Sequence, residues 1–275
     1  MKFLTLIENT ACREDLCAGH GLSLYIETTK HKILFDMGPS GAFAENAEAL
    51  GVDLKQVDVA FLSHGHFDHS GGMEAFLKGN ETAPVYLHKG AFGSYWSAAG
   101  GERRYIGVDP TLRQYANRFT ETEGTYKIDE ELTLFDAVPD EFGAMGASAS
   151  LRFEPEPGAD LPDDFRHEHN LLITAEGKTV LVSGCAHRGI VNIIRKAETL
   201  LGRRPDAVLA GFHLFQLKEG DEASNELIKR TAEALLPGHT VYYTGHCTGD
   251  YAFEALKTIL GPRLCRLSGG QGGEL

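Results

Sequence analysis

Long apolar segments and cysteine pairs are scarce in this sequence. No stretch of the 275 residues approaches the length of a membrane span, and the apolar run near the start is too short for a signal peptide. The five cysteines are odd in number and scattered, without a Cys-x-x-Cys pair: Cys12, Cys17, Cys185, Cys247 and Cys265. A disulfide framework is therefore not expected, and we expect a soluble, cytoplasmic protein without a membrane partner.

Basic residues are also few relative to acidic ones. The chain has 26 Lys and Arg against 39 Asp and Glu, a formal net charge of −13. Because nucleic-acid affinity depends largely on Lys and Arg that neutralise phosphates, this balance argues against a nucleic-acid partner. It does not exclude a small anionic substrate beside a bound metal ion, which supplies positive charge. The length fits a single α/β domain covering residues 1–275, and the sequence leaves the oligomeric state open.

The densest group of metal-ligating side chains lies in residues 63–73. It follows an apolar run at 57–62 that predicts a buried strand, and it precedes a segment of helical character. The side chains therefore lie on a tight loop at the carboxyl end of a strand, where open α/β sheets present their sites. They are His64, His66, Asp68 and His69.

These four side chains predict a metal site. Imidazole and carboxylate groups suit zinc and other transition metals. A histidine-rich surface loop is the alternative, but three histidines and an aspartate between a strand and a Gly-Gly turn favour metal. Residues two apart in an extended loop point the same way, so His64 and His66 can share one ion. Asp68 and His69, past the bend, can then face a second ion.

The pattern His-x-His-x-Asp-His after a hydrophobic strand resembles that of the metallo-β-lactamase superfamily, and the resemblance covers essentially the whole chain. Residues 34–38 resemble the family's earlier Asp-bearing strand end, and residues 244–246 resemble its late Gly-His strand end. The resemblance implies an α/β fold, a four-layer αβ/βα sandwich with metal at the edge between its halves. It also implies one or two ions, zinc with iron or manganese as alternatives, that activate a water for hydrolysis.

Hydrophobic patterning predicts strands and helices in both halves of the chain. In the first half we expect strands at 2–8, 22–28, 31–35, 57–62 and 85–88, and helices at 42–50 and 73–78. In the second half we expect strands at 170–174, 179–183, 207–214, 240–244 and 264–267, and helices at 189–201, 223–236 and 251–260. Residues 89–126 lose this rhythm, and we interpret them as a lid or insertion over the site, with a surface excursion as the alternative.

Further ligands must come from the second half, where two buried strands each run into a histidine, His187 and His246. Because parallel strand ends converge on one edge of a sheet, both histidines can meet the metal loop. We assign His187 to the ion of His64 and His66, and His246 to the second ion.

The rest of the metal shell is open at this stage. Many superfamily members carry a metal-bridging aspartate after a glycine at a strand end, where this chain has Cys185 after Gly184. Cysteine there is a ligand or a small packing residue, and the neighbouring buried strand favours packing. One tightly and one weakly held ion is then an alternative to a bridged pair. Glu168 or His169, which precede a strand, can also replace His187.

We expect several of the remaining histidines and Asp36 to have roles other than binding metal. His213 follows a strand, and we interpret it as a proton donor, an oxyanion-stabilising group or a substrate contact, with a buried structural histidine as the alternative. His20, between two glycines, is expected to line the pocket, and Asp36 to orient the metal loop by hydrogen bonds. We expect three histidines on the surface or in turns: His31, His88 and His239.

Several phrases resemble one branch of the superfamily: residues 21–23, 184–192, 211–214 and 246–249. That branch is similar to the archaeal dihydropterin-methyl ribofuranosylaminobenzene phosphate synthases. The resemblance implies a transfer that joins a pterin diphosphate to an aminobenzene riboside phosphate. The phrases surround the expected metals, so they do not fix the substrate.

Three functions are compatible with these residues. We favour a metal-dependent hydrolase of a small metabolite, a phosphate or carboxylic ester, in which the metal lowers the pKa of a water to about 7. Asp68 would hold this water and accept its proton, and His213 or the second ion would stabilise the departing oxygen. The second function is a diphosphate-displacing transferase acting on a pterin-like substrate. The third is a di-iron redox or metal-sensing protein.

Overall fold

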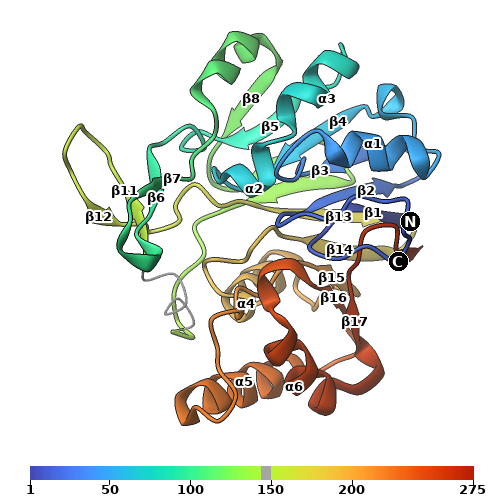
Figure 1. Cartoon of the computed structure of the whole chain (residues 1–275). Helices are drawn as coiled ribbons and strands as arrows, with labels where there is room; N and C mark the ends of the chain where they lie inside the picture. The colour runs from blue at the N-terminus through green and yellow to red at the C-terminus, as the bar shows by residue number, and fades with distance from the viewer. Residues whose placement is uncertain (144–149) are drawn as a thin grey trace.

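The computed structural model describes residues 1–143 and 150–275, and two seven-stranded sheets organise this part of the chain (Figure 1). The first sheet contains, in spatial order, β18 (Gly272–Glu274), β1 (Lys2–Ile7), β2 (Ser23–Glu27), β3 (Lys32–Phe35), β4 (Val59–Leu62), β5 (Val85–His88) and β8 (Phe119–Thr122). The second contains β17 (Leu264–Arg266), β16 (Val241–Thr244), β15 (Ala207–Leu209), β14 (Lys178–Val182), β13 (Asn170–Ala175), β10 (Leu132–Phe135) and β9 (Tyr126–Lys127).

Helices cover the outer face of each sheet (Figure 1). The first sheet carries α1 (Ala42–Ala49) and α3 (Met73–Gly79), and the second carries α4 (Ile190–Leu201), α5 (Glu222–Leu235) and α6 (Asp250–Leu260). Shorter helical segments are α2 (Phe67–Ser70), η1 (Leu54–Gln56), η2 (Ala99–Gly101), η3 (Pro110–Arg118), η5 (His246–Thr248) and η6 (Gly261–Arg263). Across the described residues, none of the helices has both the length and the apolar character of a bilayer span.

Alternation along the strands explains this layering. On β3, Leu34 packs in a core with Phe43 of α1, whereas its neighbour Phe35 packs in a core between the two sheets. Successive strand residues point to opposite faces, so each sheet has one apolar face toward helices and one toward the other sheet. A third core places Val208 of β15 with Ile194 of α4. These cores form the expected four-layer αβ/βα sandwich, and the prediction of fold class is confirmed.

Parallel pairing directs the strand ends of each half to one edge. Strands β3, β4, β5 and β8 pair in parallel within the first sheet. Strands β14, β15, β16 and β17 do so within the second. The carboxyl ends of β4, β14 and β16 precede the loops that carry the predicted ligands, so those loops lie where α/β folds bind ligands.

Most expected elements are confirmed, and the differences include the following three. The metal loop is not wholly irregular, because the amides of Ser70 and Gly71 donate to the carbonyls of His66 and Phe67 and close the short helix α2. Strand β15 ends at Leu209 instead of continuing to 214, and strand β10 was not expected. The carboxyl-terminal boundary of β15 matters because the chain beyond it turns toward the predicted site.

The predicted lid at 89–126 divides into two parts. Its first part forms β6 (Tyr95–Ser97) and β7 (Arg104–Tyr105), which join β11 (Leu151–Phe153) and β12 (Leu161–Pro162) in a small sheet at the side of the sandwich (Figure 1). Its second part, η3 and β8, packs on and extends the first sheet. The proposed lid role stays a prediction.

One expectation about the other histidines is wrong. His88 is only 3% exposed and its Nε2 lies 3.1 Å from Asp136 Oδ2, so it is a buried, paired residue and not a surface one. The amide of Gly90 donates to its Nδ1 at 2.9 Å, which leaves Nε2 as the donor to the carboxylate. His88 is the last residue of β5, and its side chain points into the protein instead of into a surface turn.

His31 connects the two halves. Its Nδ1 lies 2.8 Å from Asp58 Oδ1, just before β4, and its Nε2 lies 2.7 Å from Asp129 Oδ2, in the β9–β10 turn. Partial burial acts to lower the pKa of His31, but the bonds to both carboxylates outweigh it and raise the pKa above its ordinary value. Protonated His31 therefore stabilises the junction between the sheets.

We predict that His31→Gln reduces stability more at pH 6 than at pH 9. Because the folded-state pKa is raised, the contribution is complete below the ordinary histidine pKa of about 6.5 and is lost as pH rises through the folded value. Denaturant unfolding of both proteins at the two pH values measures the difference, expected at up to about 1 kcal/mol at pH 6. His239→Gln, an exposed histidine, is the control, and an equal loss at both pH values would contradict the prediction.

Candidate metal centre

Four turns with left-handed backbone follow the strands at the predicted edge. Asp36 (φ 59°) follows β3, Ala186 (φ 54°) follows β14, His213 (φ 50°) follows β15 and His246 (φ 48°) follows β16. Such a conformation costs a non-glycine residue about 1–3 kcal/mol and is retained where packing enforces it. Each turn redirects the chain just after its strand, so the following side chains face the same region from both sheets.

Asp36 anchors the metal loop, as expected. Its Oδ1 accepts the amide of Ser63 at 2.7 Å, and its Oδ2 accepts the Ser63 hydroxyl at 2.7 Å and lies 2.6 Å from His69 Nδ1. Burial acts to lower the pKa of His69, but Asp36 and Asp68 together raise it to about 9. The carboxylate thereby fixes the ring with Nε2 directed away from Asp36, toward the second half of the protein.

A close contact between the halves depends on Gly184. A Cβ at this position would lie 2.2 Å from Ser63 Oγ and 3.1 Å from His64 Nδ1. Only glycine therefore lets the end of β14 approach the metal loop so closely. Ser63 Oγ lies 2.8 Å from His64 Nδ1, which leaves the opposite nitrogen of His64 for another partner.

The rings of the first ligand group, His64, His66 and His187, lie close to one another. Their ring centroids are 4.6 Å (His64–His66), 4.9 Å (His64–His187) and 5.0 Å (His66–His187) apart. Around His64, the ligand atoms that lie within 4.8 Å of one another form two overlapping sets, His64 with Cys185 and His187, and His64 with His66 and Asp68. The buried Nε2 atoms of His64 and His66 have no hydrogen-bond partner in the described chain. Burial and neighbouring imidazoles lower the pKa values of His64 and His187 well below the ordinary range, which favours the neutral form that binds metals.

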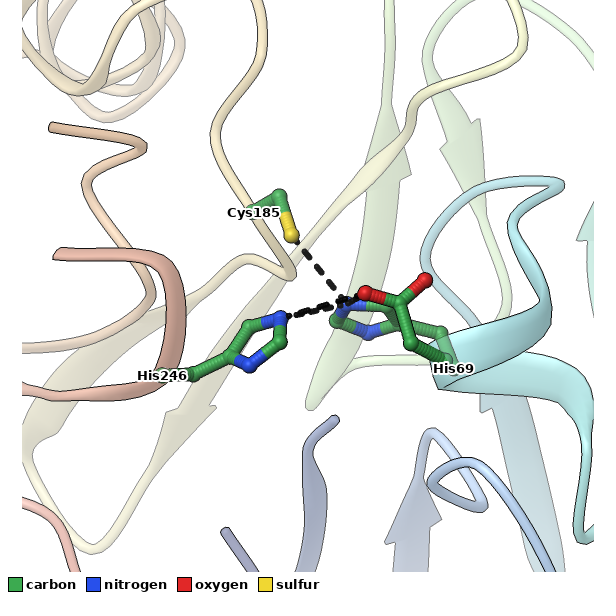
Figure 2. Close-up of side chains that lie close together, drawn as sticks. His69, Cys185 and His246 are labelled. Atoms are coloured by element: carbon green, nitrogen blue, oxygen red, sulfur yellow. Dashed lines mark hydrogen bonds and ion pairs between the residues drawn. The ribbon is translucent and has the colours of Figure 1, made fainter. Parts of the chain in front are cut away.

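The second ligand group consists of four side chains whose ligand atoms all lie within 4.8 Å of one another: Asp68, His69, Cys185 and His246. Figure 2 shows the side chains of His69, Cys185 and His246 pointing toward one another. His69 Nε2 lies 3.1 Å from Cys185 Sγ and 3.3 Å from His246 Nε2. Cys185 is buried, as a packing residue would be, but its sulfur also occupies this group.

Asp68 completes the second ligand group from α2. Its Oδ2 lies 3.5 Å from His246 Nε2 and 3.9 Å from His69 Nε2. Burial acts to raise the pKa of Asp68, but His69 and His246 hold it far below its usual range. The carboxylate is therefore ionised at neutral pH.

Two residues near the amino terminus hold His246, and sequence reasoning missed both. Asn9 Oδ1 accepts from His246 Nδ1 at 2.9 Å, so Nε2 is left to face the second ligand group. The buried carboxylate of Glu8 accepts the amide of His246. The residues Glu8-Asn9 follow β1, so their strand-end position was the available signal.

Glu168 and His169 do not replace His187. Glu168 accepts the amides of His187 and Arg188 at 2.7 and 3.0 Å, so it supports the turn that carries His187. Burial raises the pKa of Glu168 to about 7, against these two hydrogen bonds. His169 lies near Thr122, with Nδ1 3.4 Å from Oγ1, and belongs to none of the ligand groups found among the described residues.

Asp163 and His167 support His66 from the second half, and Asp163 was missed. Gly65 N donates to His167 Nδ1 at 2.9 Å, so His167 Nε2 carries the proton and donates to Asp163 Oδ2 at 3.1 Å. The same oxygen lies 3.6 Å from His66 Nε2. The Asp-x-x-x-His spacing at residues 163–167 was the signal that could have identified this pair.

The ligand groups open into a cavity of about 260 Å³. His20 lines it, as expected, with Nε2 3.6 Å from Asp68 Oδ2. His213 also lines it, and its ring centroid lies 4.2 Å from that of His187. Residues from the small sheet and its neighbours complete the lining, among them Ser97, Arg104, Ile106 and Leu151.

The donor set fits a transition-metal site. Imidazole nitrogens, a carboxylate and a thiol are the ligands that zinc and related ions take, and the unpaired buried Nε2 atoms of His64 and His66 require a partner. Contacts through Nδ1 fix the orientation of His64, His69 and His246 and leave Nε2 for metal, as is usual for ligating histidines. These observations support one or two ions without identifying the metal.

Comparisons with known proteins agree with this geometry. The family model described as the metallo-beta-lactamase superfamily matches residues 18–246. The 7,8-dihydropterin-6-methyl-4-(beta-D-ribofuranosyl)-aminobenzene-5'-phosphate synthase of Methanocaldococcus jannaschii is 29% identical over 90% of this chain and 88% of its own. An uncharacterized protein of the same organism is 28% identical over 92% and 93% of the two chains.

Two solved structures are similar over essentially the whole chain. Tm1679, described as a metal-dependent hydrolase of the beta-lactamase superfamily, has a TM-score of 0.82 and 26% identity, with 100% of this chain and 99% of its own covered. Zn(2+)-bound PqqB from Methylobacterium extorquens has a TM-score of 0.61 and 12% identity, with 100% of both chains covered, and shows the fold alone.

We predict that Asp163→Asn weakens metal binding by ~10- to 100-fold, the usual cost of changing a group next to the ligands. The carboxylate lies beside His66 Nε2 and holds His167 against the metal loop. The substitution keeps the size of the side chain but removes the charge beside His66. Competition with a chromophoric chelator measures the affinity. Asp164→Asn is the matched control, because that carboxylate pairs with exposed Arg166, and equal affinities in the two variants would refute a supporting role for Asp163.

Proposed function

Because this chain belongs to the metallo-beta-lactamase superfamily, we propose that it is a metal-dependent hydrolase of a small anionic metabolite, a phosphate or carboxylic ester. The observation that carries this proposal is the opening of two adjacent ligand groups into one cavity, which Asp68, Cys185 and His187 all line. The likeness to Tm1679 supports a hydrolase.

The ligand groups define where metal would be held. His64, His66 and His187, whose rings lie together, would hold one ion. The second ligand group would hold the other. When bound, such ions supply Lewis acidity that activates water and stabilises negative charge on a departing oxygen. The remaining steps belong to side chains at the cavity wall.

Two side chains that line the cavity would transfer protons. Asp68 is ionised at neutral pH and lines the cavity, so it would orient the attacking water and accept its proton. His213 lines the same cavity beside His187, and it would donate a proton to the leaving oxygen. A carboxylate acceptor and an imidazole donor facing one cavity are the two groups that ester hydrolysis requires.

Arg104 supports an anionic substrate. Among the described lining residues it is the only Arg or Lys, and it is exposed at the cavity mouth. Its guanidinium lies 5.8 Å from the centroid of Phe67, which also lines the cavity. A phosphate or carboxylate at the mouth would pair with this guanidinium.

A diphosphate-displacing synthase is the second candidate, favoured by the 29% identity to the archaeal synthase over 90% of this chain. In that reaction an amine or carbon nucleophile would replace water, and Arg104 would contact the phosphate groups. The same ligand groups serve both reactions, so product chemistry must separate them.

Isotope labelling distinguishes the candidates. We expect the zinc-, iron- or manganese-loaded protein to hydrolyse members of a phosphate and carboxylic ester panel in H₂¹⁸O and to incorporate one ¹⁸O into the released acid. His246→Ala should lose metal and this activity, whereas His239→Ala should keep both. Unlabelled diphosphate release that requires an added amine would overturn the hydrolase and favour the synthase.

We also predict that His213→Gln keeps both ions of the two ligand groups but lowers kcat by ~100-fold or more, as expected for loss of a general acid. Metal content by mass spectrometry and steady-state kinetics provide the two readouts. Kinetics equal to those of the parent protein would show that His213 is only structural.

A further inference from the structure

Two buried thiols lie close together at the cavity wall, and one of them, Cys247, belongs to neither ligand group. Cys185 and Cys247 are each 2% exposed, and both line the cavity. The sulfur atoms and a ring nitrogen of His213 all lie within 4.8 Å of one another. Ligands of one tetrahedral ion at bond lengths of about 2.0–2.3 Å lie roughly 3.3–3.8 Å apart, so small side-chain movements would bring these three to one ion.

The loops that carry these side chains are held together by backbone contacts. The amides of Leu214 and Phe215 donate to the carbonyl of Cys247 at 2.9 and 3.0 Å. The amide of Phe212 donates to Thr248 Oγ1 at 3.0 Å. A Cβ on Gly211 would lie 2.4 Å from Cys247 Sγ, so the approach of the two loops depends on glycine at that position.

His213 is a buried group with unmet hydrogen-bonding capacity. It is 9% exposed, and neither ring nitrogen makes a hydrogen bond of normal geometry to another described residue. A buried polar atom without a partner is destabilising, because it loses its hydrogen bonds to water without replacement. A ligand beside the two thiols would satisfy one of these nitrogens.

The chemistry of this cluster also suits a soft cation. Cysteine sulfur and imidazole nitrogen are ligands that soft and borderline metal ions take. Cys247 Sγ lies 3.5 Å from the carbonyl oxygen of Cys185, so the two turns that carry the thiols are in contact.

We propose that Cys185, Cys247 and His213 form a third site, which takes a thiophilic cation such as Cd²⁺, Cu⁺ or excess Zn²⁺. Two sulfurs and one imidazole select these ions over Mg²⁺, Ca²⁺ and Mn²⁺, which prefer oxygen. Cys185 is shared with the second ligand group, so an ion at this site lies directly beside that group. The site is inferred from geometry alone. An ion bound there would occupy His213 and so inhibit hydrolysis, a consequence that rests on the proposed function.

Cadmium titration of the zinc-loaded protein tests this site without a turnover assay. The background variant carries Cys12→Ser, Cys17→Ser and Cys265→Ser, which leaves only the two buried thiols. We expect this variant to bind one Cd²⁺ beyond its zinc and to develop thiolate-to-cadmium charge-transfer absorption in the ultraviolet. Adding Cys247→Ser should abolish the extra equivalent and most of the absorption.

His213→Gln in the same background is the second variant. It should keep the absorption but bind Cd²⁺ more weakly, by more than the ~100-fold upper range for loss of an orienting group. Equal cadmium stoichiometry and absorption with and without Cys247 would overturn the site, as would a background variant that binds no additional Cd²⁺. Either result leaves the hydrolase proposal intact, because that depends on turnover and on the two ligand groups.

Discussion

The buried carboxylate of Asp36 is the constraint on which the ligand arrangement depends. It joins the end of β3 to the metal loop through Ser63 and to the ring of His69, and its own backbone is left-handed. Carboxylate and imidazole are both fully buried, and breaking such a pair by removing one partner typically costs 3–5 kcal/mol. The pair therefore keeps His69 in the one orientation that meets Cys185 and His246.

The second half contacts this loop through a close backbone approach, and hydrogen bonds hold the turns that carry its ligands. Gly184 allows β14 to touch Ser63, and Glu168 holds the amides of the turn that carries His187. Asn9 and Glu8, from the first half, hold His246 of the second. Because each half orients ligands of the other, the ligand groups form only when both sheets are packed together.

The same packing decides the chemistry available in the cavity. An overall net charge of −13 disfavours anions at long range, yet the cavity offers Arg104 and an imidazole-rich floor. Cysteine at position 185 adds a soft donor between the ligand groups. Together with Cys247, it makes this centre chemically softer than one built from histidine and aspartate alone.

The sequence by itself determined the fold class, most strands and helices, and the metal loop, because hydrophobic alternation and the spacing of His64, His66, Asp68 and His69 are local properties. It also indicated His187 and His246, since both follow buried strands. Only the tertiary structure decided that Cys185 and Cys247 face each other, that Asp163 and His167 support His66, and that His88 is buried. Those relations arise from contacts between residues roughly 50 to 100 positions apart. Such contacts depend on how the two sheets pack and leave no periodic pattern in the chain.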